Sequence, residues 1–247
     1  MKKDEKTDKN SIKSYIKSGQ ALLRYNSYGK GFPLILLHGN MQNSRYFERQ
    51  IEFFKEYYRV IAVDSRGHGD SSFGLKKLSI ALMADDVLNL MDTLEIPQAF
   101  VLGFSDGGNI ALQLALTAPE KILALVAVSP NLNPTEMKAW INLPIQLLYG
   151  VCHLLSSMEW FDKKAQLLSL MAKGPGITTQ NLIQISLPAL IISGEFDIIQ
   201  YRHIKLIADS IPGSKLEIIK SRGHSLLHSG HKLVNTMILE FFRLKKD

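Results

Sequence analysis

Short runs of apolar residues alternate along the chain with longer stretches in which apolar residues recur every three to four positions. The short runs predict buried β-strands, because a strand covered on both faces is apolar throughout. The longer stretches predict amphipathic helices; in residues 44–57, Phe47, Ile51 and Phe54 would share one face. Strands are expected at residues 11–18, 21–27, 33–37, 59–63, 99–102, 122–128, 188–193 and 215–220.

This alternation predicts an α/β fold in which a mainly parallel sheet of eight strands is covered by helices on both faces. The pattern breaks at residues 131–187, which hold helix-like pieces and no clear strand. We therefore expect a core of residues 11–130 and 188–247, with residues 131–187 inserted as a helical cap. Further helices are expected at 79–95, 106–117 and 226–244.

The charge of the chain adds little to this picture. The net charge of +6 is concentrated toward the N-terminus, since residues 1–18 hold six lysines against three acidic residues. Residues 1–10 are expected to form a flexible basic tail. A nucleic-acid partner would need a basic patch interleaved with aromatic residues on a folded surface, and the sequence has no such cluster, so we expect no nucleic-acid partner.

Cysteine content and hydropathy suggest a compartment. Cys152 is the only cysteine, so no internal disulfide can form and nothing indicates an oxidising environment. The N-terminus begins with lysines but continues with acidic residues, and lacks the apolar segment of a signal peptide. No run approaches 18 apolar residues, so no membrane span is expected. These features predict a cytoplasmic protein.

The most informative motif is Gly103-Phe104-Ser105-Asp106-Gly107, a Gly-x-Ser-x-Gly sequence between an expected strand and an expected helix. The five letters alone are weak evidence, but this context would hold a serine on a sharp turn with its hydroxyl exposed. A serine nucleophile needs a base, and the base needs an acid that orients it. Two residues that follow later strands fit these roles, Asp197 and His224.

These residues lie in the order Ser105, Asp197, His224, and from about residue 12 to 244 the chain resembles the α/β-hydrolase family. The resemblance implies an acyl-enzyme mechanism in which Ser105 attacks a carbonyl, His224 transfers the proton and Asp197 orients the imidazole. It also implies an oxyanion hole formed by the backbone N–H groups of Asn40 and Asp106. The matching segments are residues 37–40, 64–71, 103–107, 194–197 and 223–224.

Asp106 departs from many members of the family, which carry an apolar or Gln side chain there. With Asp106, the turn at the expected nucleophile resembles the corresponding turn of biphenyl-hydrolase-like esterases, which act on amino-acid esters. This resemblance implies that the carboxylate binds a cationic group of the substrate. The alternative is that Asp106 interacts with the helix dipole, worth about 0.3–1 kcal/mol. Trp140 and Trp160, in the expected cap, are further candidates for substrate binding.

The remaining histidines indicate no metal site. His38 and His68 lie in loops that match the family, and we interpret both as structural. His224, His228 and His231 have a spacing that could suggest metal ligands, but no carboxylate is placed to support them. The sequence also lacks the glycine-rich fingerprints of nucleotide binding, so neither a metal nor a cofactor is expected.

The function that this pattern favours is a serine hydrolase that cleaves a small carboxylic ester, or a thioester or amide, with an apolar portion. C–C bond hydrolases, acyltransferases and perhydrolases of this fold keep the same triad, and the sequence does not separate them. A small-molecule receptor with slow turnover is a further alternative, which steady-state kinetics would distinguish. The substrate identity and the oligomeric state are not encoded in any motif of the chain.

Overall fold

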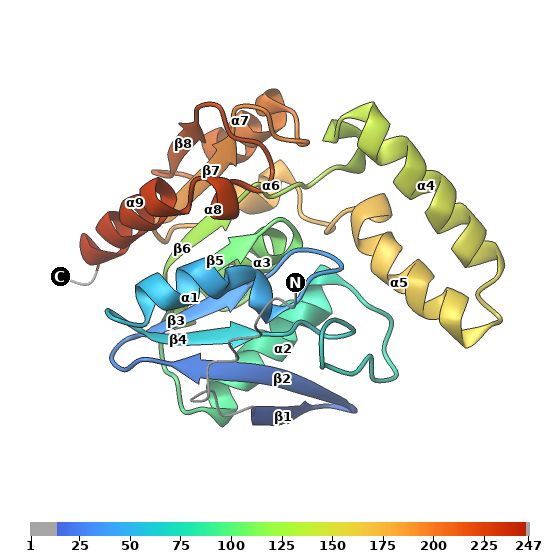
Figure 1. Ribbon diagram of the computed structural model, residues 1–247, viewed down its shortest axis with the longest axis horizontal. Helices are drawn as coiled ribbons and strands as arrows, with labels where there is room; N and C mark the ends of the chain where they lie inside the picture. Colours follow the sequence, from blue (N-terminus) through green and yellow to red (C-terminus); the bar gives the residue numbers. More distant parts are fainter. Residues whose placement is uncertain (1–13, 246–247) are drawn as a thin grey trace, which may run out of the picture.

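The computed structural model describes residues 14–245, which contain a single eight-stranded sheet (Figure 1). The strand order is β1-β2-β4-β3-β5-β6-β7-β8; β1 and β2 pair antiparallel with their neighbours and the other strands are parallel, which confirms the predicted fold class. The proposed tail, residues 1–10, lies outside the described residues. The strands are β1 (Ser14–Ser18), β2 (Ala21–Tyr28), β3 (Pro33–Leu37), β4 (Arg59–Val63), β5 (Ala99–Phe104), β6 (Ile122–Val128), β7 (Ala189–Gly194) and β8 (Lys215–Ile219).

Helices cover both faces of the sheet and create two apolar layers. Along β5, Ala99 and Val101 pack into the layer under α2, α3 and α7, whereas Phe100 and Phe104 pack into the layer under α1 and α9. This alternation follows from the period of two in a strand. The helices are α1 (Glu48–Phe54), α2 (Ile80–Thr93), α3 (Asp106–Thr117), α4 (Ala139–Leu154), α5 (Glu159–Lys173), α6 (Thr179–Leu182), α7 (Tyr201–Ser210), α8 (Leu226–Ser229) and α9 (His231–Arg243), with 3₁₀ turns at Ser44–Phe47, Pro119–Lys121 and Pro134–Glu136.

Two helix predictions need correction, and one helix outside residues 131–187 was not predicted. The helix expected at 44–57 begins with a 3₁₀ turn and ends at Phe54. The helix expected at 226–244 is divided at Gly230, whose amide donates to the Leu226 carbonyl and closes α8. Helix α7 was not predicted, although Ile204, Ile207 and Ala208 give it a buried face.

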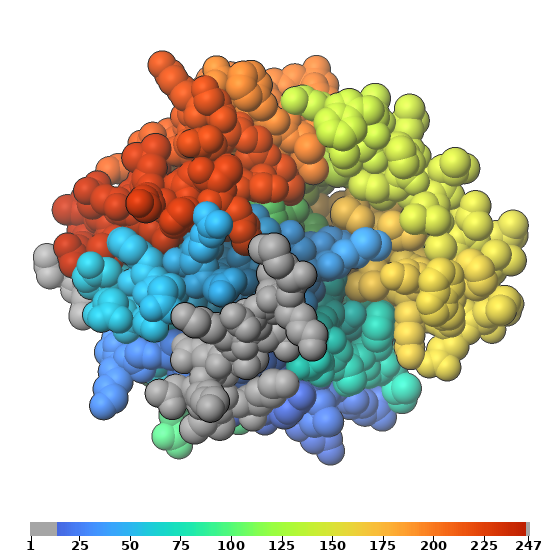
Figure 2. Space-filling model, in the orientation of Figure 1, coloured from blue at the N-terminus to red at the C-terminus, as the bar shows by residue number. Residues whose placement is uncertain are grey.

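Residues 131–187, the expected cap, pack in two different places in the structure. Helices α4 and α5 pack against each other as a hairpin that projects from the sheet (Figure 1), and it forms one flank of the molecule (Figure 2). Ile177, Leu182 and Ile185 instead pack into the layer beneath α2 and α3. The division into core and cap stays a prediction. Among the described helices, none is long and apolar enough to cross a bilayer.

Candidate active site

Ser105 occupies a strained turn between β5 and α3. Its backbone has φ 53° and ψ −118°, a conformation that non-glycine residues rarely adopt, and its amide donates to the Val128 carbonyl at 2.8 Å. The flanking glycines make this turn possible. A Cβ at Gly103 would lie 2.0 Å from the Gly107 carbonyl oxygen, and a Cβ at Gly107 would lie 1.8 Å from that of Leu37. The Gly-x-Ser-x-Gly motif is therefore a steric requirement of the turn.

His224 and Asp197 come together from the loops that follow β8 and β7. The His224 Nδ1 lies 2.8 Å from Asp197 Oδ1, so the imidazole donates from Nδ1 to the carboxylate and keeps Nε2 for another partner. The Asp197 side chain is 1% exposed and that of His224 is 21% exposed. The sequence prediction that these two residues form a pair agrees with this geometry.

Asp197 is held in its ionised form by three donors. Burial alone would raise the pKa of its carboxyl group, but hydrogen bonds from His224, from the Ser129 hydroxyl at 2.6 Å and from the Ile199 amide at 3.0 Å hold that pKa below its usual range. Ser129 directly follows β6, the neighbour of β7, and was not predicted to belong to the site. The only sequence signal was a hydroxyl residue at the carboxyl end of an adjacent strand.

Ser105 and His224 line the same cavity, which has a volume of about 200 Å³. The lining combines polar and apolar residues, so the cavity can hold a molecule with both a reactive polar group and an apolar part. The polar lining includes Gly39, Asn40, Gln42, Asp106 and Asn131, and the apolar lining includes Met137, Ile141, Ile145, Leu170, Met171, Ile198 and Ile199.

Asn40 and Asp106, whose amides are the predicted oxyanion-hole donors, both line this cavity. Asp106 is the first residue of α3, and an amide in the first turn of a helix has no partner within that helix. The Asn40 side chain is anchored to α5, since its Nδ2 donates to the Leu167 carbonyl at 2.8 Å. The neighbouring Gly39 amide donates to the Gln42 side-chain oxygen at 3.2 Å, so it is not available as a donor to an oxyanion.

The Asp106 carboxyl group is buried in the cavity wall and only partly satisfied. Its Oδ1 accepts from the side-chain Nδ2 of Asn109 at 3.5 Å, whereas Oδ2 has no hydrogen-bond partner. Burial raises the pKa of Asp106 to about 6, although the Asn40 side chain and the nearby His224 act in the opposite direction. A buried carboxyl oxygen without a partner is uncommon, and here it adjoins the cavity that holds Ser105.

His38 and His68 form a buried scaffold behind the cavity. His38 donates from Nδ1 to the Gly39 carbonyl at 2.7 Å and accepts from the Ser65 amide at 3.0 Å. Burial, together with the neighbouring His68, lowers the pKa of His38 to about 4, so its ring is neutral near pH 7. These contacts agree with the structural interpretation of both histidines. Across residues 14–245, no group of three or more His, Cys, Asp or Glu side chains could hold a metal ion.

The structure does not bring Trp140 and Trp160 into the cavity. Trp140 is 66% exposed and Trp160 is 61% exposed, and neither lines the cavity. Their candidate role in substrate binding therefore needs correction. Helix α4 directs Ile141 and Ile145 inward, one and five residues beyond Trp140, so the tryptophan lies on the opposite side of that helix.

Comparisons with known proteins extend these observations. A family model described as the alpha/beta hydrolase fold matches residues 33–153. The serine hydrolase BPHL of Mus musculus is 29% identical over 83% of this chain and 77% of that protein. The 3-oxoadipate enol-lactonase 2 of Acinetobacter baylyi is 32% identical, but over only 52% of this chain and 49% of that protein.

One relative is similar in both sequence and structure. The carboxylesterase YbfK of Bacillus subtilis is 26% identical over 84% of this chain and 79% of that protein. The crystal structure of this carboxylesterase superimposes with a TM-score of 0.78, at 22% identity over 94% of this chain and 92% of that one. At this level of identity, the structural likeness is evidence for the fold.

Proposed function

Because this chain belongs to the α/β-hydrolase fold family, we propose that it is a serine hydrolase that cleaves a small carboxylic ester through an acyl-enzyme on Ser105. One observation carries this proposal: Ser105, on its strained turn, lines the same cavity as His224, and His224 is hydrogen-bonded to Asp197. The relatives named above are hydrolases, which supports the reaction class.

In the first half of the reaction, the Ser105 hydroxyl attacks the ester carbonyl while His224 Nε2 accepts the hydroxyl proton. The proton is then delivered to the departing alcohol, and the acyl group remains on Ser105. Asp197 stabilises the imidazolium that forms, and it stays ionised because of its donors. In the second half, water is activated by His224 and releases the acid.

The tetrahedral intermediate carries an oxyanion, which we place between the backbone N–H groups of Asn40 and Asp106. Such preorganised donors are worth about 3–4 kcal/mol of barrier each. The anchoring of Asn40 to α5 supports this role, because a donor fixed before the reaction needs no reorganisation when charge develops. The amide of Asp106 is fixed by the start of α3.

The cavity favours a small substrate with an apolar portion. Its volume of about 200 Å³ is below the usual range for drug-sized ligands, roughly 300–1,000 Å³. Ile141, Ile145 and Met171 line the same cavity as Ser105, and an aliphatic or aromatic part of the ester would pack against them. A thioester or amide of the same size would react by the same steps.

The Asp106 carboxyl group favours a cationic group near the scissile bond. Its unpartnered Oδ2 is buried beside the cavity, and an ammonium group would supply the missing hydrogen bond and charge. Interaction with the helix dipole alone would favour the ionised form, whereas burial raises the pKa of this carboxyl group. The site is therefore expected to prefer an ester with an amino group close to the carbonyl.

The nucleophile is tested by intact mass after treatment with a fluorophosphonate. The wild-type protein should gain one adduct, and Ser105→Ala should gain none and lose turnover by several orders of magnitude. Ser210→Ala, at a serine of α7 remote from the cavity, is the matched control and should label as the wild type does. Labelling of the folded Ser105→Ala variant would refute the assignment.

The preference for a cation is tested with two esters of the same alcohol and similar acyl size, one neutral and one bearing an amino group. The wild-type protein should favour the amino ester in kcat/KM, and Asp106→Asn should lose about tenfold or more of that preference. The neutral ester serves as the internal control, because the backbone N–H of residue 106 is retained. An equal fall for both esters would count against cation recognition.

A further inference from the structure

The solvent-facing side of α4 is apolar along its whole length. Exposed fractions are 66% for Leu143, 73% for Leu147 and 84% for Leu154, and Trp140 and Val151 continue the same side. Between Lys138 and Glu159, residues 139–158 contain no Asp, Glu, Lys or Arg. A surface helix of a globular protein usually turns its polar residues to solvent, and this helix does the opposite.

Two polar residues of α4, Asn142 and Gln146, are half-buried on its inner side, and His153 near its end is exposed. The side chain of Gln146 donates to the Ala172 carbonyl of α5 at 3.0 Å and to Asn142 at 3.2 Å. The two helices are therefore joined by polar contacts as well as by packing around Cys152 and Leu168, while the outer side is left to face water. This inversion makes the exposed surface a candidate for contact with an apolar partner.

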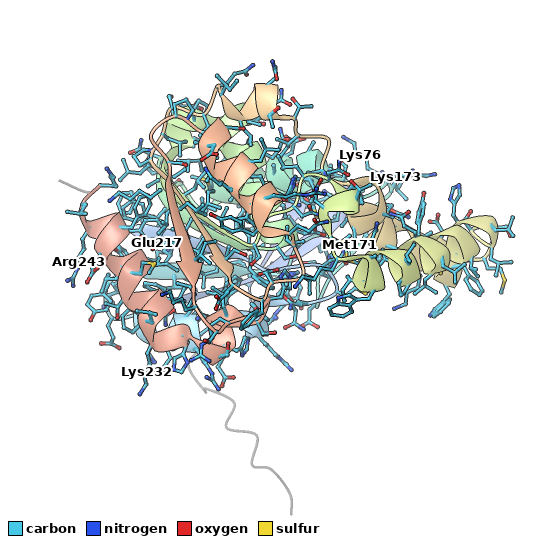
Figure 3. The ribbon with its side chains drawn as sticks, turned by 90° about the horizontal axis from the view of Figure 1, so that it is seen from above. Lys76, Met171, Lys173, Glu217, Lys232 and Arg243 are labelled. Carbon is cyan, nitrogen blue, oxygen red and sulfur yellow. The ribbon has the colours of Figure 1, made fainter. Side chains whose placement is uncertain are left out.

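The apolar surface continues around the tip of the hairpin onto α5. Met158, in the turn between the two helices, is 57% exposed, and Trp160, the second residue of α5, is 61% exposed. The hairpin extends from the body of the protein as an arm, with Met171 and Lys173 at its base (Figure 3). A projecting arm can enter a surface layer without bringing the rest of the molecule into it. We call this surface the outer apolar face: Trp140, Leu143, Leu147, Leu148, Val151, Leu154, Leu155, Met158 and Trp160.

The charges that border the outer apolar face are mainly positive. Lys164 lies over the Trp160 ring at 5.8 Å, and within residues 14–245 it forms no ion pair with a carboxylate. Lys138 precedes α4. On the acidic side, Glu159 is paired with Lys163, and Asp162 accepts a hydrogen bond from Gln166.

We propose that the outer apolar face docks this protein on an anionic lipid surface. Leucines and tryptophans would enter the boundary between headgroups and acyl chains, where Trp is favoured, and the lysines would meet the anionic headgroups. With 16 residues, α4 is about 24 Å long, shorter than the hydrocarbon core, and it would lie along the surface. A second copy of the chain fits less well, because pairing two such faces would bring their lysines together.

Docking in this way would place the cavity beside the lipid. Ile141 and Ile145 line the cavity from the inner side of α4, while Leu143 and Leu147 of the same helix belong to the outer apolar face. An apolar molecule leaving the bilayer would therefore meet the cavity wall one helix thickness away. The docking itself does not depend on the proposed hydrolase activity, and its test measures binding alone.

The two tryptophans of the chain both lie on the outer apolar face, so intrinsic fluorescence reports on it directly. The full chain is titrated with phosphatidylcholine vesicles and with vesicles containing 30% phosphatidylglycerol. We expect a blue shift of the emission and at least tenfold tighter binding to the anionic vesicles, weakened by salt. Absence of a shift and of co-sedimentation with anionic vesicles would overturn the proposal.

Variants separate this face from the lysine-rich N-terminus, which every variant retains. The double variant Leu147→Glu, Leu154→Glu should bind anionic vesicles at least tenfold more weakly, whereas Leu233→Glu, at a 59% exposed position of α9, should bind as the wild type does. Circular dichroism checks that each variant is folded. Unchanged binding of the double variant, or a blue shift that appears without lipid and follows self-association in sedimentation velocity, would refute lipid docking.

Discussion

Replacing Asp106 by Asn should stabilise the folded protein at neutral pH, although the residue forms part of the cavity wall. Burial raises the pKa of its carboxyl group from the ordinary 3.8 to about 6, a difference of about two units. One unit corresponds to about 1.4 kcal/mol, so the ionised carboxylate costs the folded state about 3 kcal/mol. The Asp106 side chain is almost fully buried, so solvent screening reduces this value little.

The sign of the effect follows from proton binding. Between pH 4 and pH 6 the folded state keeps the Asp106 proton while the unfolded state has lost it, so raising the pH stabilises the unfolded chain. The cost is absent well below pH 4 and complete well above pH 6. Asp197 has the opposite effect, because its pKa is lowered in the fold and its contribution to stability is lost on acidification.

The assay is urea unfolding of the wild type and of Asp106→Asn at several pH values from 4 to 8. The difference between the two proteins removes the contribution of Asp197, which both contain. We expect this difference in unfolding free energy to rise by about 2 kcal/mol from pH 4 to pH 8, because part of the full cost is already present at pH 4. Asp85→Asn, at an exposed position of α2, controls for the loss of one negative charge.

A difference that does not change with pH would refute the reasoning, whatever its size. A constant offset would report only the new contacts of the Asn side chain, such as those with Asn109. A difference that falls as the pH rises would mean that the carboxylate is stabilised in the fold. In that case Asp106 would not be an unsatisfied group, and the argument for a cationic substrate would lose its physical basis.

Two further predictions concern the Ser105 turn and the proposed triad. Gly107→Ala should unfold the protein or lower its stability by more than about 3 kcal/mol, because the new Cβ would lie 1.8 Å from the Leu37 carbonyl oxygen. Gly108→Ala, whose nearest contact would be 3.4 Å, is the matched control, and equal denaturant midpoints for the two variants would contradict the steric argument. Ser129→Ala should reduce kcat about tenfold with little change in KM, because Asp197 loses its 2.6 Å hydrogen bond; unchanged steady-state kinetics would show that this bond is dispensable.

The sheet could be predicted because its central strands are buried on both faces and therefore read as unbroken apolar runs. All residues of β5 and β7 are buried. Helix boundaries were harder to predict where apolar spacing runs across a break. Leu226 and Leu227 of α8 and Val234 of α9 pack into the same layer, so their pattern looked continuous across Gly230.

The three expected triad residues were accessible from sequence because each follows a strand and their order is informative. Ser129 was not, since a serine at a strand end has many roles and its hydrogen bond to Asp197 depends on β6 lying next to β7. The lack of a hydrogen-bond partner for Asp106 Oδ2 could not be predicted from the sequence either. It depends on the absence of a donor in three dimensions, which spacing along the chain does not encode.

The prediction that Trp140 and Trp160 face the cavity was wrong for a reason that bears on lipid docking. Both were expected to face the cavity, which assumes that the apolar side of a helix is its buried side. In α4 both sides are apolar, and the polar Asn142 and Gln146 lie on the inner side. The apolar spacing therefore could not show that Ile141 lines the cavity while Trp140 faces solvent. Exposing Trp140 and the leucines to water is unfavourable in an isolated protein, and contact with an apolar layer would remove that cost.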